Sequence, residues 1–215
     1  MTKYRLAVFD MDGTLLRERG IFVIAEKFGF TKQLYEEFGR EELDFYQRSK
    51  EIAKLSKGFS KKEYLEVFRK IPYNDNVKKI IKKLKEKGLI TAIATDSYLF
   101  LANDLKNRLN MDYAFANNLI IKDDIITGEL DIHNKDLIKE TWDNRIYSIC
   151  KSCVLENLAK KHKIPINQTI AIGDGIVDIG MLKKAGLGIA FNAKKEVKKY
   201  ADISTKKMNI ILDYI

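Results

Sequence analysis

The sequence contains few of the residues that mark secreted, metal-rich or membrane proteins. It has 215 residues, with only two cysteines, two histidines and two prolines. No apolar run approaches the roughly 20 residues that a membrane helix needs. The first apolar stretch follows Met1 so closely that no signal peptide fits before it. These absences predict a cytoplasmic protein with no membrane partner.

The two cysteines, Cys150 and Cys153, are spaced as C-x-x-C. Such a pair is half of a four-ligand zinc site, and no second cysteine pair completes it. A site shared with His133 and His162 is an alternative, but its spacing is poor. A redox pair is another, although such motifs usually open a helix near the N-terminus of a thioredoxin-like unit. We expect two small residues on the first turn of a helix.

The net charge is +9, from 39 lysines and arginines against 30 acidic residues. The lysines are dispersed along predicted helices, as in Lys78-Lys79 and Lys82-Lys83, and do not cluster with aromatic residues. We therefore expect no nucleic-acid partner, and a basic surface that attracts small anions mildly. A basic nucleic-acid-binding module is the alternative, and it would bind in a salt-dependent manner.

Short apolar runs alternate with segments of helical spacing. The runs at 6–9, 89–94, 169–172 and 187–191 have the length and composition of strands buried on both faces. Strands that alternate with helices indicate a parallel sheet covered on both sides. The sequence therefore predicts an α/β protein with a Rossmann-like, doubly wound parallel sheet.

Polar residues follow three of these predicted strands: Asp10 and Asp12, Thr95 and Asp96, and Asp174 and Asp178. Ligands of open parallel sheets bind outside the carboxyl ends of the strands, where these residues would converge. Buried carboxylates are costly unless a partner compensates them, and a bound cation is the simplest partner. Convergence of the three groups favours a metal site over a polar hairpin turn at Asp12-Gly13.

Four segments, in order, resemble the motifs of the haloacid dehalogenase-like superfamily. They are 9–15 (FDMDGTL), Thr95, Lys151 and 173–178 (GDGIVD). The segments 113–128 and 185–194 resemble the phosphoserine phosphatase-like branch of that superfamily, so the resemblance spans most of the chain. It implies a phosphatase, that is, a phosphoric monoester hydrolase.

The resemblance implies a catalytic role for four residues. Asp10 would attack the phosphorus atom and become an aspartyl-phosphate. Asp12 would protonate the leaving oxygen and later accept a proton from water. Thr95, with the backbone amide of Asp96, would bind a phosphoryl oxygen, and Lys151 would neutralise negative charge in the transition state.

The resemblance also implies a Mg²⁺ cofactor, which prefers oxygen ligands. The carboxylates of Asp10 and Asp174 and the main-chain carbonyl of Asp12 would hold the ion. Asp178 would support its bound waters from outside. A phospho-accepting regulatory domain without turnover would also use strand-end aspartates and Mg²⁺, and it remains an alternative of another class.

Residues 17–72 contain no convincing strand and have the position and helical character of the family's mobile cap. We predict a core domain formed by 1–16 and 73–215 and a helical cap formed by 17–72. A cap of this kind excludes water and presents substrate-reading groups to the nucleophile.

The chain departs from the phosphoserine phosphatase-like branch at the positions that read serine. An ungapped count places Arg19, with Glu18 beside it, where the branch carries a glutamate that pairs with the substrate ammonium. The cap arginine of the branch has no clear match, since Arg48 and Lys50 are only nearby. Asp96-Ser97 replaces two glycines, and Val177 replaces an asparagine. We predict a small phosphorylated metabolite, bound in part by Arg19, as the partner of a monomer or homodimer. Phosphoserine is the named alternative.

Overall fold

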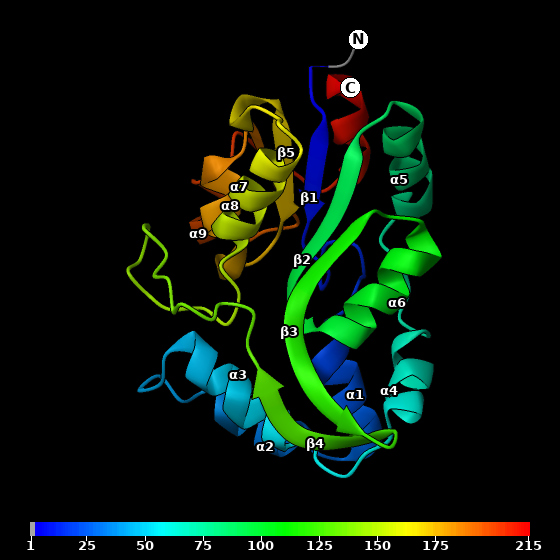
Figure 1. Cartoon of the computed structure of the whole chain (residues 1–215), viewed down its shortest axis with the longest axis vertical. Helices are drawn as coiled ribbons and strands as arrows, with labels where there is room; N and C mark the ends of the chain where they lie inside the picture. Colours follow the sequence, from blue (N-terminus) through cyan, green and yellow to red (C-terminus); the bar gives the residue numbers. More distant parts are fainter. Residues whose placement is uncertain (1–2) are drawn as a thin grey trace.

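The computed structural model describes residues 3–215 and is built on a seven-stranded sheet (Figure 1). The strand order is β4-β3-β2-β1-β5-β6-β7, and every neighbouring pair is parallel except β3 and β4. The strands are β1 (Leu6–Phe9), β2 (Ile90–Tyr98), β3 (Tyr113–Lys122), β4 (Ile125–Asp131), β5 (Thr169–Gly173), β6 (Leu187–Phe191) and β7 (Ile203–Thr205). The predicted α/β fold with a doubly wound sheet is confirmed.

The helices fall into two groups. The helices of the first group cover the sheet: α5 (Val77–Glu86), α6 (Leu99–Leu109), α7 (Lys151–Lys161), α8 (Ile179–Lys184) and α9 (Lys195–Lys198). The helices of the second group are α1 (Gly20–Phe28), α2 (Thr31–Phe38), α3 (Phe45–Lys54) and α4 (Lys61–Phe68). Short 3-10 helices lie at η1 (Ile166–Gln168), η2 (Ile176–Asp178) and η3 (Met208–Tyr214). No helix in residues 3–215 has both the length and the apolar character to cross a membrane.

Strand β1 shows why the sheet must be covered on both faces. Ala7 and Phe9 pack into one hydrophobic cluster together with α5 and α6, whereas Leu6 and Val8 pack into a second cluster with α7 and α8. Successive side chains of a strand point to opposite faces, so an unbroken apolar run fills both clusters. Helices α5 and α6 lie on one side of the sheet in Figure 1, and helices α7 and α8 lie on the other side.

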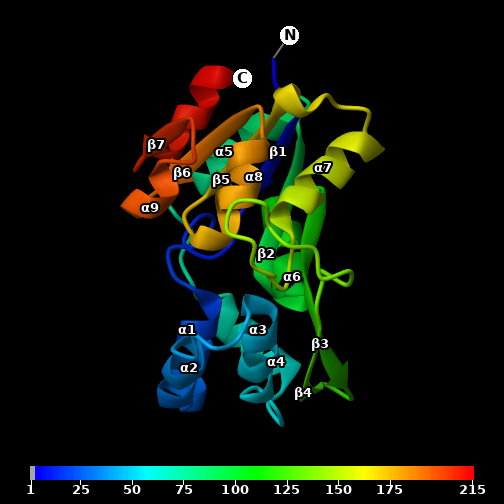
Figure 2. The same ribbon diagram turned by 90° about the vertical axis from the view of Figure 1, so that its left-hand side faces the viewer.

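Helices α1 to α4 gather beyond the carboxyl ends of the parallel strands (Figure 2). They lie within the segment that the sequence predicts to be a cap, and we keep the name cap for residues 17–72. The division of the chain into a core and a cap domain remains a prediction. The spacing of Ser60 and Glu63 predicts a capping box, and Ser60 is the N-cap of α4, where its Oγ accepts a hydrogen bond from the Glu63 amide.

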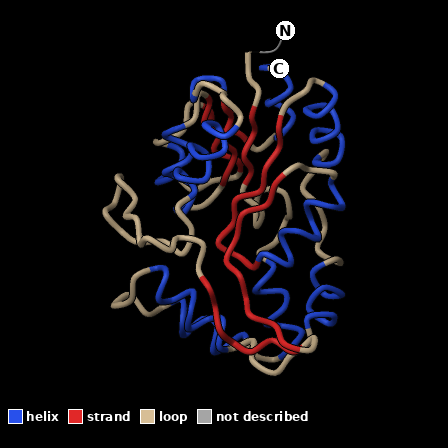
Figure 3. Tube along the Cα trace, viewed as in Figure 1, coloured by secondary structure: helices blue, strands red, loops and turns tan. Residues whose placement is uncertain are grey.

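Two local features differ from the sequence-based expectations. The residue type of Asn74 predicts an N-cap for the helix that follows it, but the N-cap of α5 is Asn76, and the Asn74 side chain donates to the turn after β1. The sequence predicts a short strand at 113–115 and a hairpin of 119–121 with 125–128; the hairpin is present, but β3 is one continuous strand from Tyr113 to Lys122. The sequence pattern assigns no structure to 129–148; the first three of these residues belong to β4, and segment 132–149 forms the irregular excursion in Figure 3.

Candidate active site

A cavity of about 510 Å³ lies at the carboxyl ends of the central strands, beneath the cap. Its lining includes nearly all of the residues predicted to form the site: Asp10, Asp12, Arg19, Asp96, Lys151, Asp174 and Asp178. These residues come from the ends of β1, β2 and β5, from the entry to the cap and from the start of α7. The fold therefore brings together residues that are far apart in the sequence, as the topology of a parallel sheet predicts.

The turn after β1 is shaped by a glycine and held by an asparagine. Gly13 has a φ of +84°, and a Cβ at this position would lie 2.6 Å from Oδ2 of Asp174. Only glycine fits this conformation and this space without strain. Asn74 Nδ2 lies 2.8 to 3.1 Å from the carbonyl oxygens of Gly13, Thr14 and Leu16 and donates to them.

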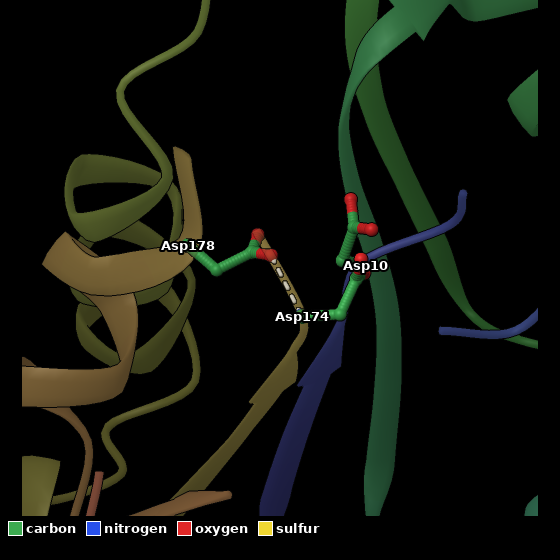
Figure 4. A group of neighbouring side chains, drawn as sticks. All are labelled: Asp10, Asp174 and Asp178. Atoms are coloured by element: carbon green, nitrogen blue, oxygen red, sulfur yellow. Dashed lines mark hydrogen bonds between the residues drawn. The ribbon is translucent and has the colours of Figure 1, made fainter. Parts of the chain in front are cut away.

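Three carboxylates converge at the floor of the cavity (Figure 4). One oxygen of each of Asp10, Asp174 and Asp178 lies within 4.8 Å of the others. Burial, and then the charge of Asp178, raise the pKa of Asp10 well above its usual value and that of Asp174 to about 6. A cation would relieve this repulsion, and an all-oxygen set suits a hard divalent ion. The cluster can therefore hold a metal ion.

Lys151 supplies a positive charge at this cluster. It is 1 % exposed, and its Nζ donates to Oδ1 of Asp10 at 2.5 Å and to Oδ1 of Asp178 at 2.6 Å. Burial opposes the charged form of this lysine, but the charges of Asp10 and Asp178 outweigh it and raise the pKa of Lys151. The ammonium group therefore stays protonated and in contact with the predicted nucleophile.

Asp178 shapes the loop after β5 as well as pairing with Lys151. Its Oδ2 accepts hydrogen bonds from the backbone amides of Asp174 at 3.0 Å and Gly175 at 2.8 Å. A Cβ on Gly173 would overlap the Asp178 carboxylate, so the close approach needs glycine. Asp178 is thus a positioning residue in this structure, which orients Asp174 toward Asp10 (Figure 4).

The side chain of Asp12 makes a different contact. Its Oδ1 accepts a hydrogen bond of 2.6 Å from the backbone amide of Gly20, the first residue of α1. Burial raises the pKa of Asp12 to about 7. An acid with this pKa has both protonation states populated near neutral pH, which suits proton transfer in either direction.

The predicted phosphate- and substrate-binding residues occupy different depths. Thr95 is fully buried, and its hydroxyl accepts a hydrogen bond from the Ser97 amide, so its contact with phosphate remains a prediction. Asp96 is exposed and lines the cavity. Asn117 Nδ2 donates to the carbonyl of Asp96 at 2.7 Å and fixes this backbone.

Arg19, rather than Glu18, lines the cavity. One of its terminal nitrogens lies 3.7 Å from the point where a Cβ on Gly175 would sit, so the guanidinium reaches over the loop after β5. Within residues 3–215 it makes no direct hydrogen bond or ion pair. Glu18 lines a separate shallow depression with Phe22 and Tyr35 on the outside of the cap.

Cys150 and Cys153 form a disulfide at the first turn of a helix, a bond that is compatible with the redox-pair alternative. Cys150 is the N-cap of α7, and the bridge spans the first turn, which carries Lys151. The predicted helical position is right. The zinc alternative fails because both sulfur atoms are bonded to each other.

Two further residues support the site and were missed by sequence reasoning. Asn74 follows the last residues of the cap in sequence, and its side chain donates to the turn after β1. Its position just after Ile71-Pro72 was the only sign in the sequence of this role. Glu140 is 3 % exposed and accepts a hydrogen bond from Ser152 Oγ at 3.1 Å, one residue after Lys151. No periodic pattern surrounds Glu140, so nothing in the sequence distinguishes it from a surface acid.

Comparisons with known proteins agree with this geometry. The family model described as haloacid dehalogenase-like hydrolase matches residues 7–183. A phosphoserine phosphatase from Methanocaldococcus jannaschii is 34% identical over 218 residues, which cover 99% of this chain and 98% of that protein. Another, from Idiomarina loihiensis, is 32% identical and covers 96% of this chain and 90% of its own length.

Solved structures show the same relationship. The substrate-bound complex of a phosphoserine phosphatase superposes with a TM-score of 0.84 at 33% identity, and the match covers 100% of both chains. A structure described as a phospho-aspartyl intermediate analogue of phosphoserine phosphatase gives a TM-score of 0.83 at 33% identity over 99% of both chains. The predictions of the branch and of a phosphoric monoester hydrolase are confirmed. The chain belongs to the haloacid dehalogenase-like hydrolase family.

Proposed function

We propose that the protein hydrolyses a small organic phosphomonoester with Mg²⁺ through an aspartyl-phosphate on Asp10. The observation that carries this proposal is the placement of Asp10 at the cavity floor, between the Lys151 ammonium and the Asp174 carboxylate. The relative described as a phospho-aspartyl intermediate analogue supports the covalent route. We also propose a cytoplasmic monomer or homodimer.

The carboxylates of Asp10 and Asp174, with the main-chain carbonyl of Asp12, would hold the Mg²⁺. When bound, the ion neutralises negative charge on the phosphoryl group. Lys151 binds one oxygen of Asp10 and leaves the other oxygen free to attack. The lysine also offsets the charge that builds on the phosphoryl oxygens as the nucleophile approaches.

Asp12 would move the proton in both half-reactions. In the first, a bond forms between Asp10 and phosphorus while the bond from phosphorus to the leaving oxygen breaks, and Asp12 donates its proton to that oxygen. In the second, water attacks phosphorus, Asp12 takes the water proton, and the Asp10 carboxylate and inorganic phosphate are released. The hydrogen bond from Gly20 orients the Asp12 carboxyl group for both transfers.

Phosphoserine is a second candidate substrate, because the relatives that match nearly the whole chain are phosphoserine phosphatases. Two features of the cavity argue against it. The Arg19 guanidinium would repel the substrate ammonium group. Arg48, which lies near the position of the branch's cap arginine, lines the cavity, but its terminal nitrogens donate to the carbonyl oxygens of Phe38 and Arg40, at 3.1 and 2.9 Å, and are not free for a substrate carboxylate.

The test is a phosphatase screen with Mg²⁺ across sugar phosphates, phosphoserine, phosphoglycolate and nucleotides. We expect turnover of at least one phosphomonoester, and a loss of at least about 10³-fold in kcat on Asp10→Asn because the nucleophile is removed. Asp136→Asn, which changes an exposed carboxylate, is the matched control and should keep full activity. Absence of turnover on the whole panel refutes the proposal, and a long-lived phospho-enzyme without turnover favours the regulatory alternative.

A further inference from the structure

The cavity wall above the carboxylates is predominantly apolar. Its apolar side chains come from the cap, from β4 and from the segment before α7: Ile21, Phe38, Phe45, Ile52, Leu130 and Tyr147. Most of them come from elements that lie beyond the strand ends, whereas the carboxylates lie at the strand ends, so a leaving group that extends toward the cap would meet them. A pocket recognises its ligand mainly through such apolar walls, with a few polar groups that fix the orientation.

The centre of this wall is a stacked pair of aromatic rings. The rings of Phe45, from α3, and Tyr147 are 4.4 Å apart at an angle of 18°. Tyr147 is 2 % exposed, and its hydroxyl donates to Asp143 at 2.5 Å, so this ring is held in place. Phe45 is half-buried and also lies 5.1 Å beneath the Arg48 guanidinium. The pair is therefore a preorganised part of the apolar wall, and most of the surface that it offers to a ligand belongs to Phe45.

Charged side chains of the cavity gather near the strand ends, while the neutral Ser49 and Ser148 lie beside the apolar wall. Arg19 and Asp96 both line the cavity near the strand ends, and they attract each other electrostatically. Arg48 also lines the cavity, but both of its terminal nitrogens donate to backbone carbonyls, among them that of Leu43, so only its buried Nε has no partner. A compact zwitterion such as phosphoserine would lie at the polar end and leave most of the wall uncovered.

We infer that the leaving group of the substrate carries an aromatic or branched apolar portion that packs on Phe45, Ile52 and Tyr147. This inference rests on the proposed function and names the substrate class for it. Arg19 and Asp96 would then face the polar atoms next to the phosphate, while the wall contacts the remote part of the molecule. Binding energy from that remote part would position the ester over Asp10.

Three phosphate esters test the inference: 2-phenylethyl phosphate, phosphoserine and glycerol 3-phosphate. All three release a primary alkyl alcohol, so differences in kcat/KM report on binding of the leaving group rather than on its acidity. We expect kcat/KM for 2-phenylethyl phosphate to exceed the other two by about 30-fold or more, the range seen for apolar pocket contacts. Phosphoserine hydrolysed as efficiently as 2-phenylethyl phosphate would overturn the inference and leave the proposed function intact.

Substitutions in the apolar wall provide a second test of the inference. Phe45→Ala should lower kcat/KM about tenfold for 2-phenylethyl phosphate but change it less than about twofold for glycerol 3-phosphate. Phe45→Leu keeps the apolar bulk and serves if the alanine variant fails to fold. Tyr35→Ala removes a cap aromatic that does not line this cavity and should change neither value. Equal losses on both esters in the Phe45 variants would refute a specificity role.

Calorimetric binding separates this inference from the proposed function. Asp10→Asn should bind 2-phenylethyl phosphate at least about tenfold more tightly than phosphoserine, because the wall is unchanged. If the wild-type protein turns over no ester but this preference in binding holds, the proposed function fails and the ligand class stands. Equal or reversed affinities would refute the ligand class.

Discussion

Lys151 balances the charge of the site, because it is the ammonium group that contacts both Asp10 and Asp178. Both carboxylates are buried, so removal of the lysine leaves two uncompensated buried charges. We expect Lys151→Met to lower the free energy of unfolding by about 3 kcal/mol at pH 7, measured by urea denaturation without added metal. Lys184→Met, which breaks the half-exposed pair with Glu156, should cost less than about 1 kcal/mol. Similar losses in the two variants would contradict this account.

Arg19 is the residue that we expect to act against phosphoserine as a substrate. Its guanidinium reaches into the cavity and would repel an ammonium group. We expect Arg19→Glu to raise kcat/KM for phosphoserine by about tenfold or more, because repulsion is replaced by attraction. Arg17→Gln, which alters an exposed arginine paired with Asp75, is the control and should have no effect. An unchanged or lower phosphoserine activity in Arg19→Glu would show that Arg19 does not read the substrate.

Glu140 makes stability depend on pH. Burial raises the pKa of its carboxyl group, so the folded state holds the proton more tightly than the unfolded state does. The stability that this group contributes is present below its unfolded pKa and is lost as the pH rises through its folded pKa. We expect Glu140→Gln to melt at a higher temperature than the wild type at pH 7.5, and the gap to close near pH 4. Glu129→Gln, at an exposed site, should show no such trend. A gap that persists at low pH would indicate a cause other than charge.

At the scale of elements, the proposed metal site depends on how closely the turn after β1 approaches the end of β5. A Cβ on Gly13 would push Oδ2 of Asp174 away, and the positive φ adds backbone strain. We expect Gly13→Ala to abolish the rise in melting temperature that millimolar Mg²⁺ gives the wild type. Gly29→Ala, at another positive φ with no atom within 4 Å, should lose some stability but keep the Mg²⁺ response. A full Mg²⁺ response in Gly13→Ala would place the ion elsewhere.

The sequence predicts elements well where a local pattern determines them. Strands β1 and β5 are apolar runs that end at Asp10 and Gly173, and α1 ends at Gly29, which adopts the left-handed conformation. Prediction from the sequence fails where the interaction partner of a residue lies far away in the chain. Asn74 precedes α5 like a cap, but its partners are carbonyl oxygens about sixty residues earlier. Glu140 lies in a segment without periodicity, and its burial depends on packing against α7 and α8.

For the whole molecule, four ordered motifs allow the fold and the floor of the site to be predicted, but not the wall of the cavity. The motif residues lie at strand ends, whose position follows from the sheet. Wall residues such as Phe45 and Tyr147 come from segments about one hundred residues apart, and only the folded chain shows that they stack. The role of Arg48 could not be predicted from the sequence either, because it depends on hydrogen bonds to backbone carbonyls such as that of Phe38.

The cap is also joined to the core along the edge of β4. Backbone hydrogen bonds connect Gly58 and Phe59 to Ile126, and Lys61 to Asp124, at 2.8 to 2.9 Å. The segment between α3 and α4 thus pairs with part of a strand that would otherwise end the sheet. A shortened enzyme without residues 17–72 would lose these partners as well as its lid. Its newly open edge would be free to pair with another copy, so the expected product of such a deletion is an aggregating protein rather than a smaller, less selective phosphatase.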